Sequence, residues 1–245
     1  MKNKKTLLAL FLAAFSSAVF AQSVVITPKK VIYKRTKPND EYRKTFTLTH
    51  PKVKAVNAVL ARKIEAAIGF EKNMEISLKE EIGGDIQWLE EGFYDVKYNQ
   101  NGVLSINLFI TGAGAYPSSV NKTIVVDLKT GNRIGPAAVF TNLDGLLAKI
   151  KQIQQEKIKA NFEERKTDTD FMEVRDEIEE LLKKSDFKAS DLEGFSVDEK
   201  GVTFFYDYGF RHAVQALEPD GDYFLSWAEI KPFVKRTGLL GKFVR

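Results

Sequence analysis

Apolar and polar residues alternate in several short stretches of the chain, which is the pattern of half-buried β-strands. The alternation is clear at 42–49, and again at 93–98 and 103–109 on either side of the tetrapeptide Asn-Gln-Asn-Gly at 99–102. Because Asn and Gly tolerate positive φ angles, the last two stretches are predicted to form a β-hairpin. Further strands are predicted at 23–34, 122–128, 195–197, 202–206 and 223–227.

Three other stretches repeat their apolar residues every three or four positions, which is typical of amphipathic helices. The first is expected to begin at Pro51 and to end at Gly69, and the second spans about 143–164. The third follows a break at 166–169, where Asp170 is expected to cap the helix and Glu173 to complete a capping box.

This order of elements indicates an α+β fold with mainly antiparallel sheets, one N-terminal helix and a central helix pair. The length exceeds that of a usual single domain, so we expect two closely packed subdomains. Their predicted ranges are 22–115 and 116–236, meeting near a small-residue loop at 111–119. The last nine residues, 237–245, are expected to be a loosely held basic tail.

The first 21 residues have the three parts of a secretory signal peptide. Lys2, Lys4 and Lys5 precede an apolar run at 7–15, and Val-Phe-Ala at 19–21 is suited to signal cleavage. The run is too short to cross a bilayer. We therefore expect an exported protein, periplasmic or extracellular, with no membrane span after the signal is removed.

The predicted cleavage changes the charge of the chain. The full sequence has 37 Lys and Arg against 33 Asp and Glu, and the leader holds three of the lysines and no acid. The remaining 224 residues therefore carry a net charge of +1, which gives no support to a nucleic-acid partner. With no Cys and two His, the composition excludes disulfides and disfavours metal sites, and we expect neither metal nor cofactor.

The segment 112–119 is the first candidate for a binding site. Gly114 would allow close approach of a ligand, Tyr116 offers a ring face for stacking, and Ser118 and Ser119 offer hydroxyls. The segment matches neither a phosphate loop nor a nucleophile elbow. The alternative is a tight structural crossing between two subdomains, for which small residues are needed anyway.

Tyr208 and His212 are two further candidates, in a stretch rich in aromatic residues. A Ser-His-Asp set could be assembled from Ser118, His212 and Asp207, but such a choice exists in nearly any chain of this length. We therefore expect no catalytic residue. The aromatic residues between 204 and 227 are expected to form core, with stacking on sugars or a protein partner as the alternative.

Several motifs follow one another with sensible spacing along most of the chain. His50-Pro51 ends a predicted strand before Asn57, and Gly114-Ala115-Tyr116-Pro117 precedes the Asp-Leu-Lys-Thr-Gly segment at 127–131. An aromatic strand at 201–206 is then followed by Trp-Ala-Glu-Ile-Lys-Pro at 227–232. This succession resembles the extracellular domain of the lysozyme-sensing anti-sigma-V factor and the non-catalytic region of peptidoglycan polysaccharide deacetylases. The His of that family's loop is Tyr116 here, so no role of its imidazole is carried over.

The resemblance implies a mixed α+β fold and a binding role outside the membrane, with cell-wall glycan or a wall-degrading enzyme such as lysozyme as ligand. We therefore expect an exported, non-enzymatic binding protein of the cell envelope. Two alternatives stay open, an envelope hydrolase with its site near 112–119 and a structural subunit that self-associates. The candidate ligand-binding residues are Gly114, Tyr116, Ser118, Ser119, Tyr208 and His212.

Overall fold

Five strands form the larger of two β-sheets in the computed structural model, which describes residues 23–39, 43–85, 87–114 and 116–245. The predicted signal peptide at 1–21 lies outside the described residues. The strands follow the order β1-β2-β3-β4-β5, and all neighbours are antiparallel except the short parallel pairing of β2 with β3. Their bounds are β1 Val25–Lys34, β2 Thr45–Lys54, β3 Leu89–Gln100, β4 Val103–Ala113 and β5 Pro117–Asp127.

The smaller sheet is antiparallel and has the order β6-β7-β8. These strands are β6 Phe195–Val197, β7 Gly201–Phe205 and β8 Asp222–Ser226. The α+β class and the mainly antiparallel pairing predicted from the sequence are confirmed, and so is the hairpin between β3 and β4. Its turn places Asn101 at φ 52° and Gly102 at φ 70°, the conformation that these residue types adopt most readily.

Seven α-helices accompany the sheets in the described part of the chain. The central helix pair is confirmed as α5 Leu143–Arg165 and α6 Thr169–Lys184. Two short helices near the N-terminal helix were not anticipated, because one or two turns show no periodicity. The remaining bounds are α1 Ala58–Ala67, α2 Phe70–Met74, α3 Leu78–Gly83, α4 Pro136–Val139 and α7 Trp227–Ile230.

The start of the first helix differs from the prediction. Strand β2 continues through Pro51, which pairs with Pro28 of β1, and the helix begins at Ala58. The Asn57 side chain caps it by accepting a hydrogen bond from the Leu60 N–H at 2.8 Å. Val53 is buried within the strand, whereas Val56 is 83% exposed, so the apparent helical spacing of these two valines was accidental.

The start of the second long helix also differs by two residues. Asp168, and not Asp170, is the capping residue of α6, because its carboxylate accepts hydrogen bonds from the N–H groups of Asp170 and Phe171. The expected capping box with Glu173 is therefore replaced by a single side-chain cap.

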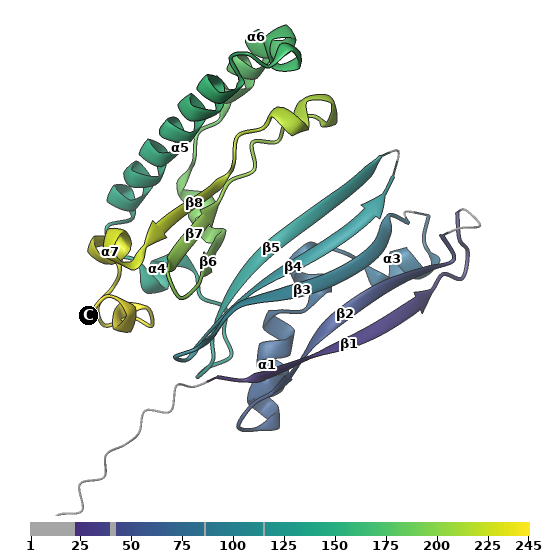
Figure 1. Cartoon of the computed structure of the whole chain (residues 1–245). Coiled ribbons are helices and arrows are strands. Elements are labelled where there is room, and N and C mark those ends of the chain that lie inside the picture. The colour runs from purple at the N-terminus through teal and green to yellow at the C-terminus, as the bar shows by residue number, and fades with distance from the viewer. Residues whose placement is uncertain (1–22, 40–42, 86, 115) are drawn as a thin grey trace, which may run out of the picture.

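The two sheets share a hydrophobic core at one end of the molecule. Val103 and Val125 of the large sheet pack with Phe195 and Phe204 of the small sheet. The buried Ser105 hydroxyl accepts a hydrogen bond from the Val197 N–H at 3.0 Å. We refer to the large sheet with helices α1–α3 as the first or N-terminal lobe, and to the small sheet with the later helices as the second lobe. Figure 1 shows that the two lobes come together near β6 and α4 and diverge toward the turn between β4 and β5.

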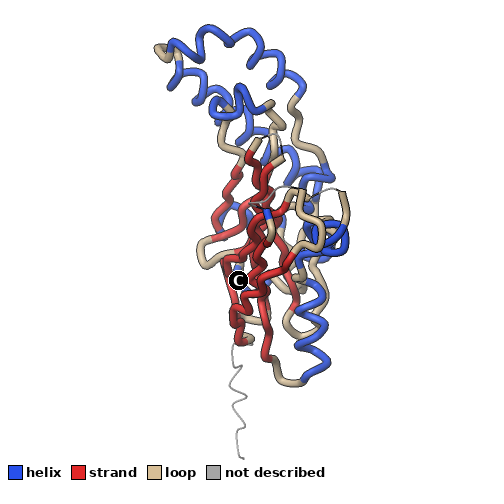
Figure 2. The backbone as a smooth tube through the Cα atoms, turned by 90° about the vertical axis from the view of Figure 1, so that its right-hand side faces the viewer, coloured by secondary structure: helices blue, strands red, loops and turns tan. Residues whose placement is uncertain are grey.

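The opposite face of the large sheet is covered by the N-terminal helices. Ile64 of α1 and Phe70 of α2 belong to the same buried cluster as Ile106 and Leu108 of β4. The side view in Figure 2 shows helices lying along one side of the strands, with the α5–α6 pair extending beyond the end of the sheets. β5 is an edge strand of this sheet, and its outer half, residues 117–122, is exposed.

Two of the expected boundaries fall inside packed structure. β5 pairs with β4 from Pro117 to Asp127, so the division expected between 115 and 116 lies in the turn of one hairpin. Residues 237–245, expected to be a loose tail, enter the shared core, where Leu240 is fully buried. Phe243 stacks on Trp227 with ring centroids 4.5 Å apart.

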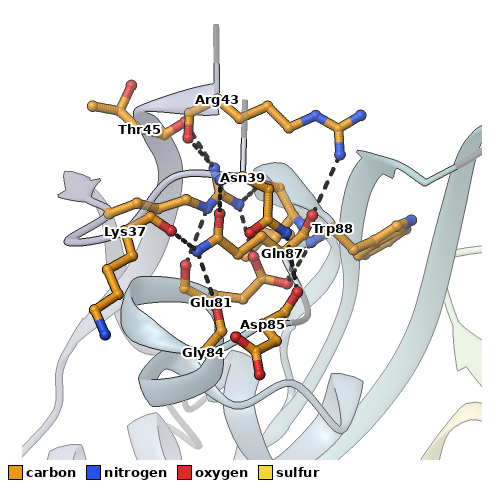
Figure 3. A network of polar contacts seen from close by, with 11 residues as sticks. Lys37, Asn39, Arg43, Thr45, Glu81, Gly84, Asp85, Gln87 and Trp88 are labelled. Carbon is orange, nitrogen blue, oxygen red and sulfur yellow. Dashed lines mark hydrogen bonds and ion pairs between the residues drawn. The ribbon is translucent and has the colours of Figure 1, made fainter. Parts of the chain in front are cut away.

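A buried polar network joins the ends of β1, β2, α3 and β3 (Figure 3). Its centre is the Arg35 guanidinium, which forms an ion pair with Glu81 at 2.7 Å and donates to the Leu89 carbonyl at 2.6 Å. Gln87 adds hydrogen bonds to the carbonyls of Lys37 and Gly84. Each charged group therefore has partners that compensate for its removal from water.

Candidate functional site

The segment 112–119, predicted to be a loop, is the tip of the β4–β5 hairpin. Gly112 and Ala113 end β4, and β5 starts again at Pro117. Gly112 lies directly against the backbone of Trp88, since an added Cβ would come within 2.1 Å of the Trp88 carbonyl oxygen. Gly112 is therefore small because another part of the chain passes close to it. This agrees with the expected need for small residues at a tight crossing, although both parts of the chain belong to the same lobe and not to two subdomains.

Tyr116 projects from this hairpin tip and meets His212 from the other lobe. Their rings stack with centroids 5.1 Å apart and an interplanar angle of 30°. His212 is the first residue of the 3-10 helix η3, His212–Leu217, which follows the small sheet's second strand. Tyr116 remains 65% exposed, so one aromatic contact bridges the diverging ends of the lobes and still presents a ring surface to solvent.

An open hollow of about 680 Å³ surrounds this aromatic pair. Ser118 and Ser119 line it, and the Ser118 hydroxyl accepts a hydrogen bond from the indole N–H of Trp88 at 3.0 Å. The tertiary structure therefore brings four of the six predicted residues to one place: Tyr116, Ser118, Ser119 and His212. Gly114 lies at the hairpin tip beside them, where its N–H donates to the Tyr116 carbonyl at 3.2 Å.

Tyr208 lies elsewhere, in the interior of the second lobe. It is 8% exposed, and its hydroxyl forms a hydrogen bond with that of Tyr223 at 2.8 Å. Burial raises the pKa of both phenols. Tyr208 raises the pKa of Tyr223 further, whereas the hydrogen bond with Tyr223 lowers the pKa of Tyr208 by a smaller amount than burial raises it. Tyr208 is thus placed to hold the core between α6 and β8 and does not line the hollow beside His212.

Three polar residues that sequence reasoning missed also line the hollow. They are Glu90, Thr111 and Gln215. Glu90 sits at an irregularity in the β3–β4 pairing, and such bulges redirect a side chain relative to its neighbours. An isolated Glu, Thr or Gln is unremarkable in a sequence, so no pattern could have selected them.

The hollow continues as a longer cleft between the free edge of β5 and the second lobe. A central section of about 540 Å³ shares Ser119 and Gln215 with the first hollow. An inner section of about 420 Å³ shares Asn121 and Tyr206 with the central one. We refer to these three connected sections as the interlobe cleft.

The chemistry that these residues can perform is mainly recognition. The hollow combines an exposed aromatic face with hydroxyl, amide and carboxylate groups, which can stack on a ring and exchange hydrogen bonds with hydroxyls. Among the residues that the structure describes, no hydrogen bond joins His212 to Ser118 or Ser119, although all three line the same hollow. In the same described ranges, no cluster of three or more His, Cys, Asp or Glu side chains is arranged to hold a metal ion.

Within the ranges that the structure describes, no helix combines the length and the apolar character that crossing a bilayer requires.

Comparison with known proteins identifies similar folds and gives no activity. No known family and no curated protein matches the sequence. A member of the DUF3298 family, a domain of unknown function, from Bacteroides fragilis is similar in structure, with a TM-score of 0.53 and 14% identity over 91% of this chain and 98% of that one. A DUF3298 family protein from Pseudomonas aeruginosa has the same TM-score at 12% identity, covering 87% of this chain and 94% of that one. These similarities show a shared fold with domains of unknown function.

Proposed function

We propose that the chain is an exported, non-enzymatic binding protein of the cell envelope that recognises cell-wall glycan at the hollow around Tyr116 and His212. The stacked Tyr116–His212 pair is the observation that carries this proposal. A sugar ring presents apolar C–H groups on one face and hydroxyls around its rim. An exposed aromatic ring surrounded by hydroxyl and amide groups is complementary to both features.

The position of the pair at the outer end of the cleft suits a long ligand. The hollow is open to solvent, and its lining residues Glu90, Ser119 and Gln215 come from both lobes. A polymer chain could therefore lie across the hairpin tip without its ends having to enter the protein. The resemblance to the lysozyme-sensing anti-sigma-V factor and to the peptidoglycan deacetylases supports a location in the cell envelope. It also supports a lysozyme-like protein as the second candidate ligand.

The proposal is tested by sedimentation of residues 22–245 with insoluble peptidoglycan. Replacing Tyr116 by Ala removes the stacking face, and we expect the affinity to fall about threefold to tenfold, the size of a lost aromatic contact. The matched control is Phe224→Ala, which removes another exposed aromatic ring, 44% accessible on β8, without touching the hollow. The control should bind like the unchanged protein.

Two results would contradict this function. If the unchanged protein neither sediments with peptidoglycan nor binds lysozyme, the chain is not a sensor of either ligand. If it releases soluble fragments from peptidoglycan, and Ser118→Ala or His212→Ala abolishes the release, the chain is a hydrolase that uses the side chains gathered in the hollow.

A further inference from the structure

The outer half of β5 is an open strand edge that faces the interlobe cleft. Leu128, directly after β5, donates its N–H to the Gly102 carbonyl. The backbone N–H and C=O groups of the even-numbered residues of β5 therefore point toward β4. The backbone groups of the odd-numbered residues point away from β4. Two hydrogen bonds show this: Ile134 N–H donates to the Val125 carbonyl, and Asp127 N–H donates to the Asn132 carbonyl. Because backbone groups alternate along a strand, those of Ser119 and Asn121 also point away from β4.

The chain already uses the inner part of this edge for strand pairing. Val126 forms an isolated antiparallel bridge with Arg133, so a short piece of the chain already pairs with this edge. Beyond it, the stretch from Pro117 to Lys122 is exposed, and within the described residues no partner occupies the outward N–H and C=O groups of Ser119 and Asn121. An extended segment placed there would continue the same pairing.

The two edges of the large sheet differ in the residue types that oppose the addition of a further strand. The opposite edge, β1, carries Pro28, Lys29 and Lys30, the residue types that discourage addition of a strand. On β5, Pro117 and Lys122 flank the exposed stretch, and the four residues between them, Ser118–Asn121, include neither a proline nor a charged residue. The interlobe cleft lies along this edge, because Ser119 and Asn121 line its central section together with Asp222 of β8.

The wall across the cleft is negatively charged. Asp207, Glu218 and Asp222 line its central section, and no Lys, Arg or His does. None of the three carboxylates is in an ion pair among the residues that the structure describes. The nearby Lys157 is paired with Asp220. Burial raises the pKa of Glu218, and the neighbouring Asp207 raises it further, against the lowering effect of the backbone hydrogen bonds that this carboxylate accepts. Burial and the neighbouring Asp220 likewise raise the pKa of Asp222, against a smaller lowering effect of Lys157 and Lys97.

We propose that the edge of β5 at Ser119–Asn121 binds an extended, positively charged peptide segment of a partner protein as an additional strand. Main-chain hydrogen bonds to Ser119 and Asn121 supply the pairing, and Lys or Arg side chains on one face of the segment reach the carboxylates of the opposite wall. Half-buried Phe205 and Tyr206 between them accept the apolar stems of those side chains. This interaction goes beyond the proposed glycan binding and does not depend on it.

The test uses residues 22–245 and fluorescent hexapeptides, measured by anisotropy. Acetyl-(Lys-Thr)₃-amide is expected to bind, and acetyl-(Glu-Thr)₃-amide is expected to bind at least tenfold more weakly. Two further peptides carry N-methyl groups on either the lysines or the threonines. A strand at an edge uses every second N–H for pairing, so one methylated set should abolish binding and the other should leave it within about twofold.

The protein side is tested by removing charge from the acidic wall. The double variant D207N/D222N should weaken binding of the lysine peptide about tenfold, whereas D198N/E199Q, in the β6–β7 turn outside the cleft, should not change it. Hydrogen exchange should show new protection of the Ser119 and Asn121 amides in the complex.

Equal binding of the acidic peptide, tolerance of both methylation patterns, or protection elsewhere would overturn the proposal. Loss of glycan binding in Tyr116→Ala with peptide binding retained would separate the two functions.

Discussion

His50 illustrates how one residue in this chain acquires its properties from its neighbours. The sequence places it before Pro51 at a strand end and predicts a surface or capping role. In the structure it is half-buried within β2, where its Nε2 lies 2.9 Å from the Tyr33 hydroxyl and its ring meets Phe70 edge-on at 5.8 Å. Burial lowers the pKa of His50, and the positive charges of Lys52 and Lys29 lower it further, against a smaller opposing effect of Glu71.

This lowered pKa predicts a pH dependence of stability. A folded pKa below the usual 6.5 means that the unfolded chain binds the proton more readily. The stabilisation is present above about pH 6.5 and is lost as the pH falls through the folded pKa. Urea denaturation at about pH 7.5 and pH 5.5 should therefore show a smaller loss of stability on acidification for His50→Gln than for the unchanged protein.

The chain's other histidine, His212, is exposed on η3, so His50 is the imidazole that the fold removes from water. An identical pH response in His50→Gln would show that the folded state does not disfavour the protonated imidazole.

The Arg35 network reinforces the N-terminal lobe at the place where regular strand pairing is short. β2 and β3 pair in parallel through a short register, Thr47 with Glu91 and Leu48 with Gly92. Arg35 adds hydrogen bonds from β1 to the carbonyls of Arg43 and Thr45 on one side and of Glu81 and Leu89 on the other. One side chain thus connects the end of β1 to the start of β2, to α3 and to the start of β3.

Replacing Arg35 by Ala is expected to lower the free energy of unfolding by about 3–5 kcal/mol, because it leaves the buried Glu81 carboxylate without its counter-charge. The matched control is Arg175→Ala, which breaks the exposed pair with Glu179 on α6 and should cost at most about 0.5 kcal/mol. Denaturant titration measures both. Similar losses in the two variants would mean that the network contributes no more than a surface ion pair.

At the level of elements, prediction succeeded where the pattern was long and failed where two patterns overlapped. The 23 residues of α5 were predicted within one residue at either end, and the β3–β4 hairpin was identified by its Asn-Gly turn. The segment at 51–57 was predicted to be helical because Val53 and Val56 are three positions apart. Pairing of Pro51 and Val53 with β1 decided against the helix, and a partner strand cannot be read from local spacing.

The whole molecule depends on a core that its last residues complete. Leu240 and Val244 pack with residues of α5 and of both sheets in the core shared by the lobes. Lys and Arg in the final segment suggested a loose tail, yet its apolar residues Leu239, Leu240, Phe243 and Val244 are those that the fold uses. The lobes therefore have no independent cores at this end, and they are expected to unfold together.

Leu240→Ala should destabilise the entire molecule by about 2–5 kcal/mol, the range for removing a fully buried leucine side chain. The neighbouring Leu239, which is partly buried, supplies the control, and its replacement by Ala should cost less than half as much. Circular dichroism and tryptophan fluorescence should report one coincident transition in Leu240→Ala. Two separate transitions, with one lobe unaffected, would contradict the shared core.

The sequence by itself determined the α+β class, the helix pair and the residue types of the candidate site, because periodicity and turn chemistry are local properties. Tertiary structure alone decided that Tyr116 stacks on His212, that Tyr208 is buried, and that Glu90 and Gln215 join the hollow. Residues 116 and 212 are brought together by the way two sheets pack through a common core. No feature within either segment encodes that distance, so the site exists only once both lobes have folded.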